Sequence, residues 1–211
     1  MNCAGLIISI IHSIFMTSSH YNDAFWSDKY QSRQTVWNIG YPSPPITAYI
    51  DQLEQKDLRI LMPGCGRAYE AEYLLQKGFH NIMLLDISSE LVHELQQKFI
   101  DQPVHILQGD FFQHTGQYDL VLEQTFFCSL DPSQRKDYVD QLYNLLMPGG
   151  TMAGVLFNRT FEAGPPFGGS RKEYQELFEL KLFIKTMELC YNSIDERRGN
   201  ELFIILKHIN W

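Results

Sequence analysis

The hydrophobic residues of this chain gather in short, nearly continuous runs, separated by longer stretches in which apolar residues recur at helical spacing. Runs rich in Ile, Leu and Val that end at polar or glycine residues predict strands. These runs lie at residues 58–62, 81–86, 104–108, 118–123 and 151–157. The amphipathic stretches predict helices at about residues 67–77, 89–99, 132–146 and 171–181. Strands that are hydrophobic throughout are typical of parallel sheets covered on both faces, so the pattern predicts repeated βα units.

Two further hydrophobic runs, residues 182–190 and 202–209, follow one another with only the polar stretch "NSIDERRGN" between them. Consecutive strands joined without a helix predict an antiparallel hairpin. We therefore expect an α/β fold with a doubly wound, seven-stranded, mostly parallel sheet and a C-terminal antiparallel hairpin. In such sheets, ligands bind outside the carboxyl ends of the strands, where the strand order reverses.

A tight glycine turn, "PGCGR", follows the first predicted strand. Gly64 and Gly66 allow the backbone to approach a ligand closely, and the start of the next helix offers unpaired N–H groups. Tyr69 stands where a dinucleotide-binding fingerprint has its third glycine, which weakens that interpretation. Asp86 ends the second strand, 20 residues after Gly66. A carboxylate there can accept hydrogen bonds from both ribose hydroxyls of an adenosine-type ligand.

The third predicted strand ends in an acidic and an aromatic residue, within "QGDFF". Asp110 can accept from the exocyclic amine of a purine, and Phe111 can pack on its face. Each feature alone has an ordinary structural explanation, since Asp is common in turns and a glycine turn occurs in any α/β protein. Their order along three successive strand ends favours an adenosine site.

Composition and charge narrow the possible partners. A chain of 211 residues that is 45% hydrophobic can bury one substantial core. The 17 basic and 25 acidic residues give a net charge of −8, which lacks the basic surface of a nucleic-acid binder. The four cysteines lie far apart and have no histidine at ligand spacing, so we predict neither a disulfide framework nor a metal site. These observations favour a cytoplasmic protein with a small-molecule partner and no nucleic-acid or membrane partner. The oligomeric state stays open, and a monomer is compatible with them.

An apolar run at residues 6–15 has the length of a signal-peptide core, but no basic residue precedes it and no small-residue cleavage site follows. We therefore predict that residues 1–15 are a non-essential N-terminal extension and that residues 16–211 form a single domain. Its expected parts are an N-terminal lid segment, a cofactor-binding core, a substrate loop with its helix, and the terminal hairpin. They correspond to residues 16–56, 57–157, 158–181 and 182–211.

The chain resembles the thiopurine S-methyltransferase family of S-adenosylmethionine-dependent methyltransferases, together with the plant halide and thiol methyltransferases. The similarity runs from about Trp26 to the C-terminus. Its residues are "FWSDKY", "PGCGRAYEAEYLLQKGF", "LLDIS", "GDFF", "YDLVLEQTFFCSLDPSQR", "LLMPGG" and "GPPF". The resemblance implies a Rossmann-like class I methyltransferase fold, S-adenosyl-L-methionine as cofactor and a small molecule, preferably a thiol, as methyl acceptor.

The resemblance also implies which residues contact the cofactor. These are Trp26, Tyr30, Trp37, Gly64, Gly66, Asp86, Ile87, Asp110, Phe111 and Gln124. Electron-rich rings attract the sulfonium cation of the cofactor, and Trp26 and Tyr30 lie four residues apart, on one face of a helix. Tyr30 replaces the tryptophan commonly expected there, and Gln124 stands where the plant relatives have a tyrosine. From the residues alone, packing of a helix on the sheet explains the same aromatic residues.

The acceptor site is expected in the Gly- and Pro-rich loop after the fifth strand and in "TFFCSL". Arg159 can favour a thiolate or carboxylate on the substrate, or can be a solvated loop residue. Phe126 or Phe127 can face the substrate, or can pack in the core. No general base is predicted, because a thiol with a pKa near 8.5 is already a few per cent ionised at neutral pH.

Two other functions remain open. A protein with this fold can bind S-adenosylmethionine as a sensor or as an inactive homologue without turnover. The chain also contains one Y-x-x-x-K pair, Tyr73 and Lys77, which is found in nicotinamide-dependent oxidoreductases. That pair lies in the helix just after the glycine turn, away from the expected position of a substrate carbon.

Overall fold

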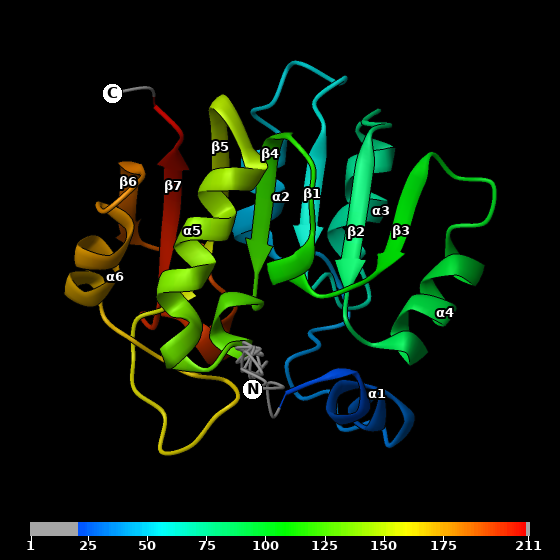
Figure 1. The fold of residues 1–211 in the computed structure, drawn as a ribbon, viewed down its shortest axis with the longest axis horizontal. Coiled ribbons are helices and arrows are strands. Elements are labelled where there is room, and N and C mark those ends of the chain that lie inside the picture. Colours follow the sequence, from blue (N-terminus) through cyan, green and yellow to red (C-terminus); the bar gives the residue numbers. More distant parts are fainter. Residues whose placement is uncertain (1–20, 210–211) are drawn as a thin grey trace, which may run out of the picture.

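The computed structural model of the chain describes residues 21–209, and the predicted extension at residues 1–15 lies outside them. Seven strands form one sheet in the order β3-β2-β1-β4-β5-β7-β6 (Figure 1). They are β1 Ile60–Pro63, β2 Ile82–Asp86, β3 Val104–Gln108, β4 Tyr118–Gln124, β5 Leu146–Phe157, β6 Phe183–Leu189 and β7 Glu201–Lys207. β1 to β5 are parallel where they pair, and β7 is antiparallel to both β5 and β6. The predicted mostly parallel sheet with a terminal hairpin is confirmed.

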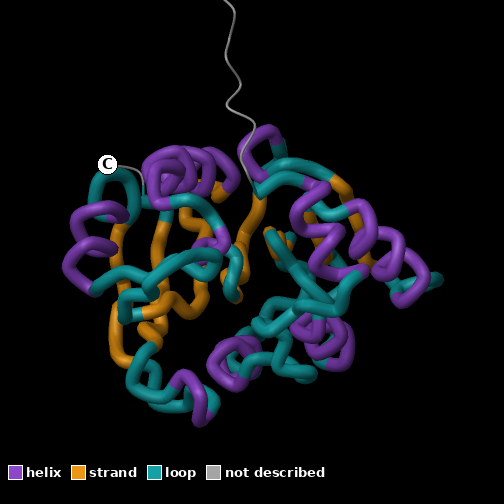
Figure 2. Tube along the Cα trace, turned by 90° about the horizontal axis from the view of Figure 1, so that it is seen from below, coloured by secondary structure: helices purple, strands orange, loops and turns teal. Residues whose placement is uncertain are grey.

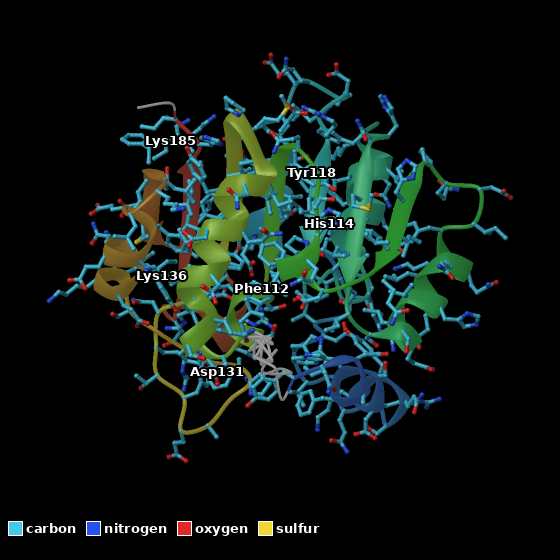
Figure 3. All side chains as sticks on the ribbon, in the orientation of Figure 1. Phe112, His114, Tyr118, Asp131, Lys136 and Lys185 are labelled. Carbon is cyan, nitrogen blue, oxygen red and sulfur yellow. The ribbon has the colours of Figure 1, made fainter. Side chains whose placement is uncertain are left out.

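The order of the strands reverses between β1 and β4, which lie side by side at the centre of the sheet. Their carboxyl ends, with those of β2, β3 and β5, point toward the lower edge in Figure 1, where α1 (Asp23–Gln31) and the loop after β5 lie. Figure 3 shows Tyr118 at the far end of β4 and Asp131 near this lower edge. The segments that follow β1 to β5 therefore meet at one side of the molecule.

Side chains of each strand alternate between two cores, one on each face of the sheet. Leu61, Val121 and Met152 pack with residues of α5 (Arg135–Leu145) and α6 (Arg171–Phe178). Ile60, Met62, Leu120 and Leu122 face the other core. That second core also contains residues of α2 (Pro44–Ile50), α3 (Tyr69–Gln76) and α4 (Ser89–Lys98). Both faces are covered by helices, as Figure 2 shows, which explains the continuous hydrophobic runs in the sequence.

The helices differ from their predicted ranges mainly at their ends. The helix predicted from residue 132 opens as a 3₁₀ turn, Pro132–Gln134, because Asp131 accepts a hydrogen bond from Ser133 N at 2.9 Å and α5 follows. The strand predicted at 151–157 starts earlier, at Leu146, and contains the glycines of "PGG". α2 was not predicted, since seven residues that begin with two prolines show too few helical repeats.

Among the helices of residues 21–209, none has the length and apolar character that a membrane crossing requires.

Candidate active site

Two adjoining cavities lie at the carboxyl edge of the sheet. The larger one, about 350 Å³, is lined by residues that follow β1 to β5, by α1 and by the turn between β6 and β7. The smaller one, about 60 Å³, lies against the glycine turn after β1. Trp37, Gly64 and Thr125 line both cavities. An elongated ligand that occupied both would therefore pass these three residues.

The glycine turn has the backbone that the sequence predicted. Gly64 and Gly66 have φ of +55° and +51°, a region that favours glycine. A Cβ on Gly64 would lie 2.2 Å from the ring of Phe126, so only glycine permits this approach. Gly66 has no such contact and lines only the smaller cavity. Gly64 thus packs directly against the turn that follows β4.

Asp86 and Asp110 end β2 and begin the turn after β3, and both line the larger cavity together with Ile87 and Phe111. Asp86 is 8% exposed and accepts from Ser88 N at 3.0 Å. Burial raises the pKa of the Asp86 carboxyl to about 6. Asp110 accepts from Phe112 N at 2.9 Å, which fixes the 3₁₀ turn carrying Phe111. The two carboxylates and the ring thus line the larger cavity where the neighbouring strands β2 and β3 end.

Three aromatic residues of the N-terminal segment form one edge-to-face cluster at the cavities. The ring of Trp37 lies 5.5 Å from that of Trp26 and 5.9 Å from that of Tyr30, with interplanar angles of 83° and 85°. All three line the larger cavity. Burial, and then the charge of Asp86, raise the pKa of Tyr30, so its hydroxyl stays protonated at neutral pH.

Helix α1 holds this aromatic cluster by docking on the start of α4. Ser27 Oγ lies 3.0 Å from Ser88 Oγ. Asp23 accepts from Ser27 Oγ at 2.6 Å and from Ser89 N at 2.8 Å, and these hydrogen bonds lower the pKa of Asp23. The N-terminal segment is thereby fixed to the same loop that carries Asp86 and Ile87.

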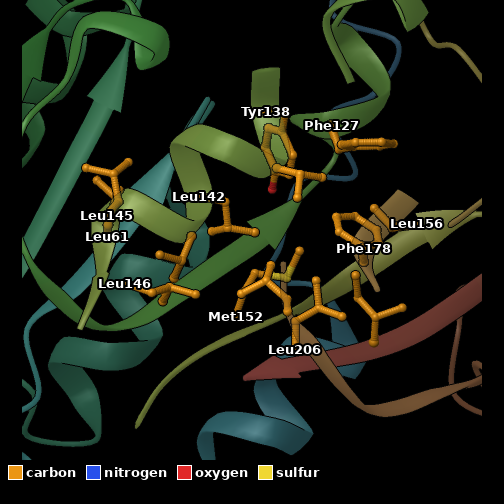
Figure 4. Packing of buried hydrophobic residues seen from close by; sticks show 14 of the residues in the cluster. Leu61, Phe127, Tyr138, Leu142, Leu145, Leu146, Met152, Leu156, Phe178 and Leu206 are labelled. Carbon is orange, nitrogen blue, oxygen red and sulfur yellow. The ribbon is translucent and has the colours of Figure 1, made fainter. Parts of the chain in front are cut away.

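The sequence left open whether Phe126 or Phe127 faces the substrate, and the turn after β4 places the two side chains differently. Phe126 lines the larger cavity, whereas Phe127 is 1% exposed and lies outside both cavities. Figure 4 shows Phe127 beside Tyr138 in the core, with a ring distance of 4.9 Å. Phe127 is therefore a core residue. Gln124 lines the smaller cavity, and its Oε1 is buried without a hydrogen-bond partner among the described residues.

Arg159 also lines the larger cavity, from the loop after β5, which is separated from β2 by β1 and β4, and its guanidinium lies 4.8 Å from the ring centre of Phe161. A second arginine, Arg197, was missed. It lies in the turn between β6 and β7, donates to Trp37 O at 3.0 Å and stacks 5.5 Å from the ring of Phe157. Because β6 runs parallel to β5, this turn lies at the same edge as the other strand ends, which the predicted hairpin already implied.

The geometry supports neither nicotinamide-dependent chemistry at Tyr73 and Lys77 nor a reactive cysteine at the larger cavity. Tyr73 and Lys77 lie at the surface, where both contact Asp51, and line neither cavity. Cys128 lines the larger cavity, but burial raises the pKa of its thiol far above neutral pH. Among the described residues, no group of three or more His, Cys, Asp or Glu side chains is arranged to hold a metal ion.

Curated proteins related to this chain are methyltransferases. Probable thiol methyltransferase 2 of Arabidopsis thaliana is 28% identical over 185 residues, which cover 83% of this chain and 81% of that protein. A thiopurine S-methyltransferase of Vibrio parahaemolyticus is 30% identical over 178 residues, which cover 73% of this chain and 80% of that protein.

Solved structures share the fold. The 1,6-didemethyltoxoflavin-N1-methyltransferase of Burkholderia thailandensis, with bound 1,6-didemethyltoxoflavin and S-adenosylhomocysteine, superposes with a TM-score of 0.71 at 16% identity. The match covers 89% of this chain and 87% of that one. A TehB-like methyltransferase of Corynebacterium glutamicum gives a TM-score of 0.64 at 17% identity, over 88% of this chain and 97% of that one.

Family membership follows from the match that spans the whole site. Residues 21–205 match the thiopurine S-methyltransferase (TPMT) family, and this range begins at the aromatic cluster and ends beyond the turn that carries Arg197. Both cavities, with every residue that lines them, lie inside it. The protein therefore belongs to the thiopurine S-methyltransferase family and is an S-adenosylmethionine-dependent methyltransferase.

Proposed function

We propose that the protein transfers the methyl group of S-adenosylmethionine to the sulfur of a small, anionic or easily ionised thiol. The observation that carries this proposal is the pair of joined cavities. The larger cavity contains the two carboxylates proposed to bind adenosine, Asp86 and Asp110. It also contains the two arginines proposed to bind the acceptor, Arg159 and Arg197. The smaller cavity lies against the glycine turn.

The residues present fit the cofactor. Gln124 lines the small cavity beside the glycine turn, and its Oε1 is a buried acceptor without a partner among residues 21–209, so it would accept from the ammonium group of the methionine end. Asp86 and Asp110 would hold the ribose and the adenine, with Ile87 and Phe111 against the base. When bound, the cofactor supplies a methyl group on a positively charged sulfur, which is an activated electrophile.

The protein's own part in the reaction is positioning. Trp37, Gly64 and Thr125 line both cavities, so they are the residues that would surround the sulfonium. Aromatic faces near a cation are favourable by about 0.5 to 2 kcal/mol, more when water is excluded. In-line displacement requires the attacking sulfur to approach from the larger cavity, and holding it there contributes most of the rate.

The acceptor end favours a negative charge beside aromatic surface. Arg159 and Arg197 stack on Phe161 and Phe157, whose rings lie 5.1 Å apart. Guanidinium groups at this end would favour the thiolate over the thiol. They would also donate hydrogen bonds to a carboxylate or a ring nitrogen of the substrate. Phe126 would contact the acceptor on the opposite side. This arrangement supports aromatic or heterocyclic thiols ahead of sulfide or halides.

The remaining expectations belong to this proposal. Residues 16–211 would form one methyltransferase domain, with the lid segment, cofactor core, substrate loop and hairpin at the predicted boundaries. The protein would act in the cytoplasm on a diffusible substrate, with its oligomeric state left open. Its net charge of −8 supports a small-molecule acceptor over a polyanion.

The test is a transfer assay with labelled methyl S-adenosylmethionine, run against aromatic thiols, alkyl thiols, sulfide and iodide. We expect the highest kcat/KM with an aromatic thiol that carries a carboxylate. Arg159→Ala should raise KM for that thiol by about tenfold, the effect of losing a hydrogen bond to a charged group. Arg198→Ala is the control, because Arg198 is exposed and outside the cavities.

Two results would contradict the proposal. Cofactor binding without transfer to any acceptor would favour the sensor interpretation. Equal rates with Arg159→Ala and the parent protein would remove the role of Arg159 and leave the choice of acceptor to the aromatic walls.

A further inference from the structure

We propose that Glu123 is a positioning residue for methyl transfer. Its buried side chain fixes the turn after β4 and thereby holds Gln124, Thr125 and Phe126 at the junction of the two cavities. The inference rests on the proposed function for its cofactor, and it adds a residue that lies outside both cavities.

The Glu123 carboxylate makes three hydrogen bonds within the core. Oε1 accepts from Phe126 N and from Phe127 N, both at 2.9 Å. Oε2 accepts from the hydroxyl of Tyr138 on α5 at 3.1 Å. The residue is 0% exposed, and it has no ion pair with a basic side chain of residues 21–209. The backbone of this turn and the hydroxyl of Tyr138 therefore stabilise the carboxylate.

The turn needs such a constraint because its backbone is unfavourable. Thr125 has φ of +61°, which is a strained conformation for a β-branched residue and persists only where surrounding contacts impose it. Thr125 Oγ1 donates to Gln124 O at 2.7 Å, and Cys128 Sγ donates to Thr125 O at 3.3 Å. The Glu123 bonds to the next two amides close the same turn from the core side.

The strained turn contains the residues that line the two cavities where they adjoin. Gln124 lines the smaller cavity, and its buried Oε1 has no hydrogen-bond partner among the described residues. Thr125 lines both cavities, and the Phe126 ring packs on Gly64.

By contrast, the adenosine end is built from the loops after β2 and β3, which Glu123 does not contact by any hydrogen bond. The turn reaches that end through ring contacts of Phe111 with Phe126 and with Tyr138, both at 5.2 Å. Loss of Glu123 should therefore affect the methionine end of the cofactor more than the adenosine end.

The neighbouring strand also leaves room for this side chain. A Cβ on Gly154 of β5 would lie 2.4 Å from Glu123 Cβ and 2.5 Å from Glu123 O.

Burial raises the pKa of the Glu123 carboxyl to about 7, so near neutral pH the neutral acid is well populated. Glutamine, which is neutral and keeps an acceptor oxygen for both amides, is thus the conservative replacement.

The experiment compares two ligands in three variants, Glu123→Leu, Glu123→Gln and Asp119→Leu. Calorimetry measures the affinities for S-adenosylhomocysteine, which reaches the junction, and for adenosine, which does not. We expect Glu123→Leu to weaken S-adenosylhomocysteine by about tenfold or more and adenosine by much less, with most of the affinity restored in Glu123→Gln. Asp119→Leu is the matched control, since Asp119 binds Arg59 at the other end of β4.

Equal losses for both ligands in Glu123→Leu would mean that Glu123 only stabilises the fold and would overturn the proposal, as would no loss for either. If Glu123→Leu does not fold, Tyr138→Phe removes one of the three hydrogen bonds and should weaken S-adenosylhomocysteine by about threefold while sparing adenosine; an unchanged affinity would contradict the inference. Wild-type protein that binds S-adenosylhomocysteine but methylates no thiol would contradict the proposed acceptor without affecting this result.

Discussion

Trp37 is the side chain on which discrimination between cofactor and product should depend. It lines both cavities and packs edge-on against Trp26 and Tyr30. S-adenosylmethionine carries a positive sulfur and S-adenosylhomocysteine does not, so a ring at the junction favours the former. Trp37→Leu should weaken S-adenosylmethionine about 3- to 30-fold more than S-adenosylhomocysteine, as measured by calorimetry.

Tyr191→Leu is the control for this comparison, because Tyr191 is 89% exposed and lines neither cavity. An equal loss for both ligands in Trp37→Leu would mean that the ring contributes shape alone and not attraction to the charge.

At the scale of single residues, the sequence predicted the site residues that follow strand ends. It could not distinguish between adjacent residues whose side chains point in different directions. Asp86 and Asp110 were predictable because a strand end fixes the side of the sheet on which the next residue lies. Phe126 and Phe127 were not separable, since the positive φ of Thr125 sets which ring faces the cavity. Arg197 gave no local signal and depends on the pairing of β6 with β7.

Asp23 is one of the residues that attach helix α1 to the rest of the molecule, since it accepts hydrogen bonds both from its own helix and from the start of α4. Asp23→Ala should loosen α1 and, with it, the aromatic cluster. Hydrogen exchange should show faster exchange of the α1 amides and no change in β1 or β4, and S-adenosylmethionine should bind several-fold more weakly.

Asp28→Ala provides the comparison for α1, since Asp28 lies on the same helix and is exposed. Faster exchange in both variants would indicate that helix propensity, and not docking on α4, controls the segment.

Gly154 of β5 packs directly against Glu123 of β4. In Gly154→Ala, the new Cβ would meet the backbone and side chain of Glu123, which have little freedom to move. Overpacking of this kind costs about 1 to 3 kcal/mol, so urea denaturation should give a lower free energy of unfolding by that amount. Gly199→Ala, in the open turn before β7 and without such a contact, should cost only the strain of its φ of +75°. A stability of Gly154→Ala equal to that of the parent protein would mean that β5 can shift away from β4.

At the scale of elements, runs of apolar residues predicted every strand of the described residues. Burial on both faces leaves such a run in the central strands β1, β2 and β4, whereas the edge strands β3 and β6 carry apolar runs although they are partly exposed. The ends were less predictable. β5 begins at Leu146 because its first residues pair with Tyr118 of β4 across an irregular register, and no local pattern encodes that partner. α2 buries only Pro45, Ile46 and Ile50, too few positions to reveal a helical period.

Stability of the whole molecule should depend on pH through two buried carboxyls at the site. Burial raises the pKa of Asp86 to about 6 and of Glu123 to about 7, from ordinary values of 3.8 and 4.5. The folded protein keeps these protons to higher pH than the unfolded chain, so their contribution is complete below about pH 4 and is lost as pH rises to 7.

Comparison with the double variant Asp86→Asn and Glu123→Gln isolates this contribution from histidines that titrate in the same range. Between pH 5 and pH 7.5, the free energy of unfolding of the parent protein should fall by roughly 2 to 4 kcal/mol relative to the variant. Denaturation with urea at both pH values measures it. Parallel pH profiles would show that these carboxyls titrate normally.

The position of β7 has a consequence for how the enzyme is made. The strand synthesised after all the others lies between β5 and β6, so β6 has no partner in the sheet until residues 201–207 have left the ribosome. The turn just before β7 carries Arg197, whose bond to Trp37 joins the late hairpin to the early aromatic cluster. A nascent chain can therefore form β1 to β5 first, yet the part of the larger cavity that Arg197 lines, and the bond of Arg197 to Trp37, depend on the later pairing of β7 with β5 and β6.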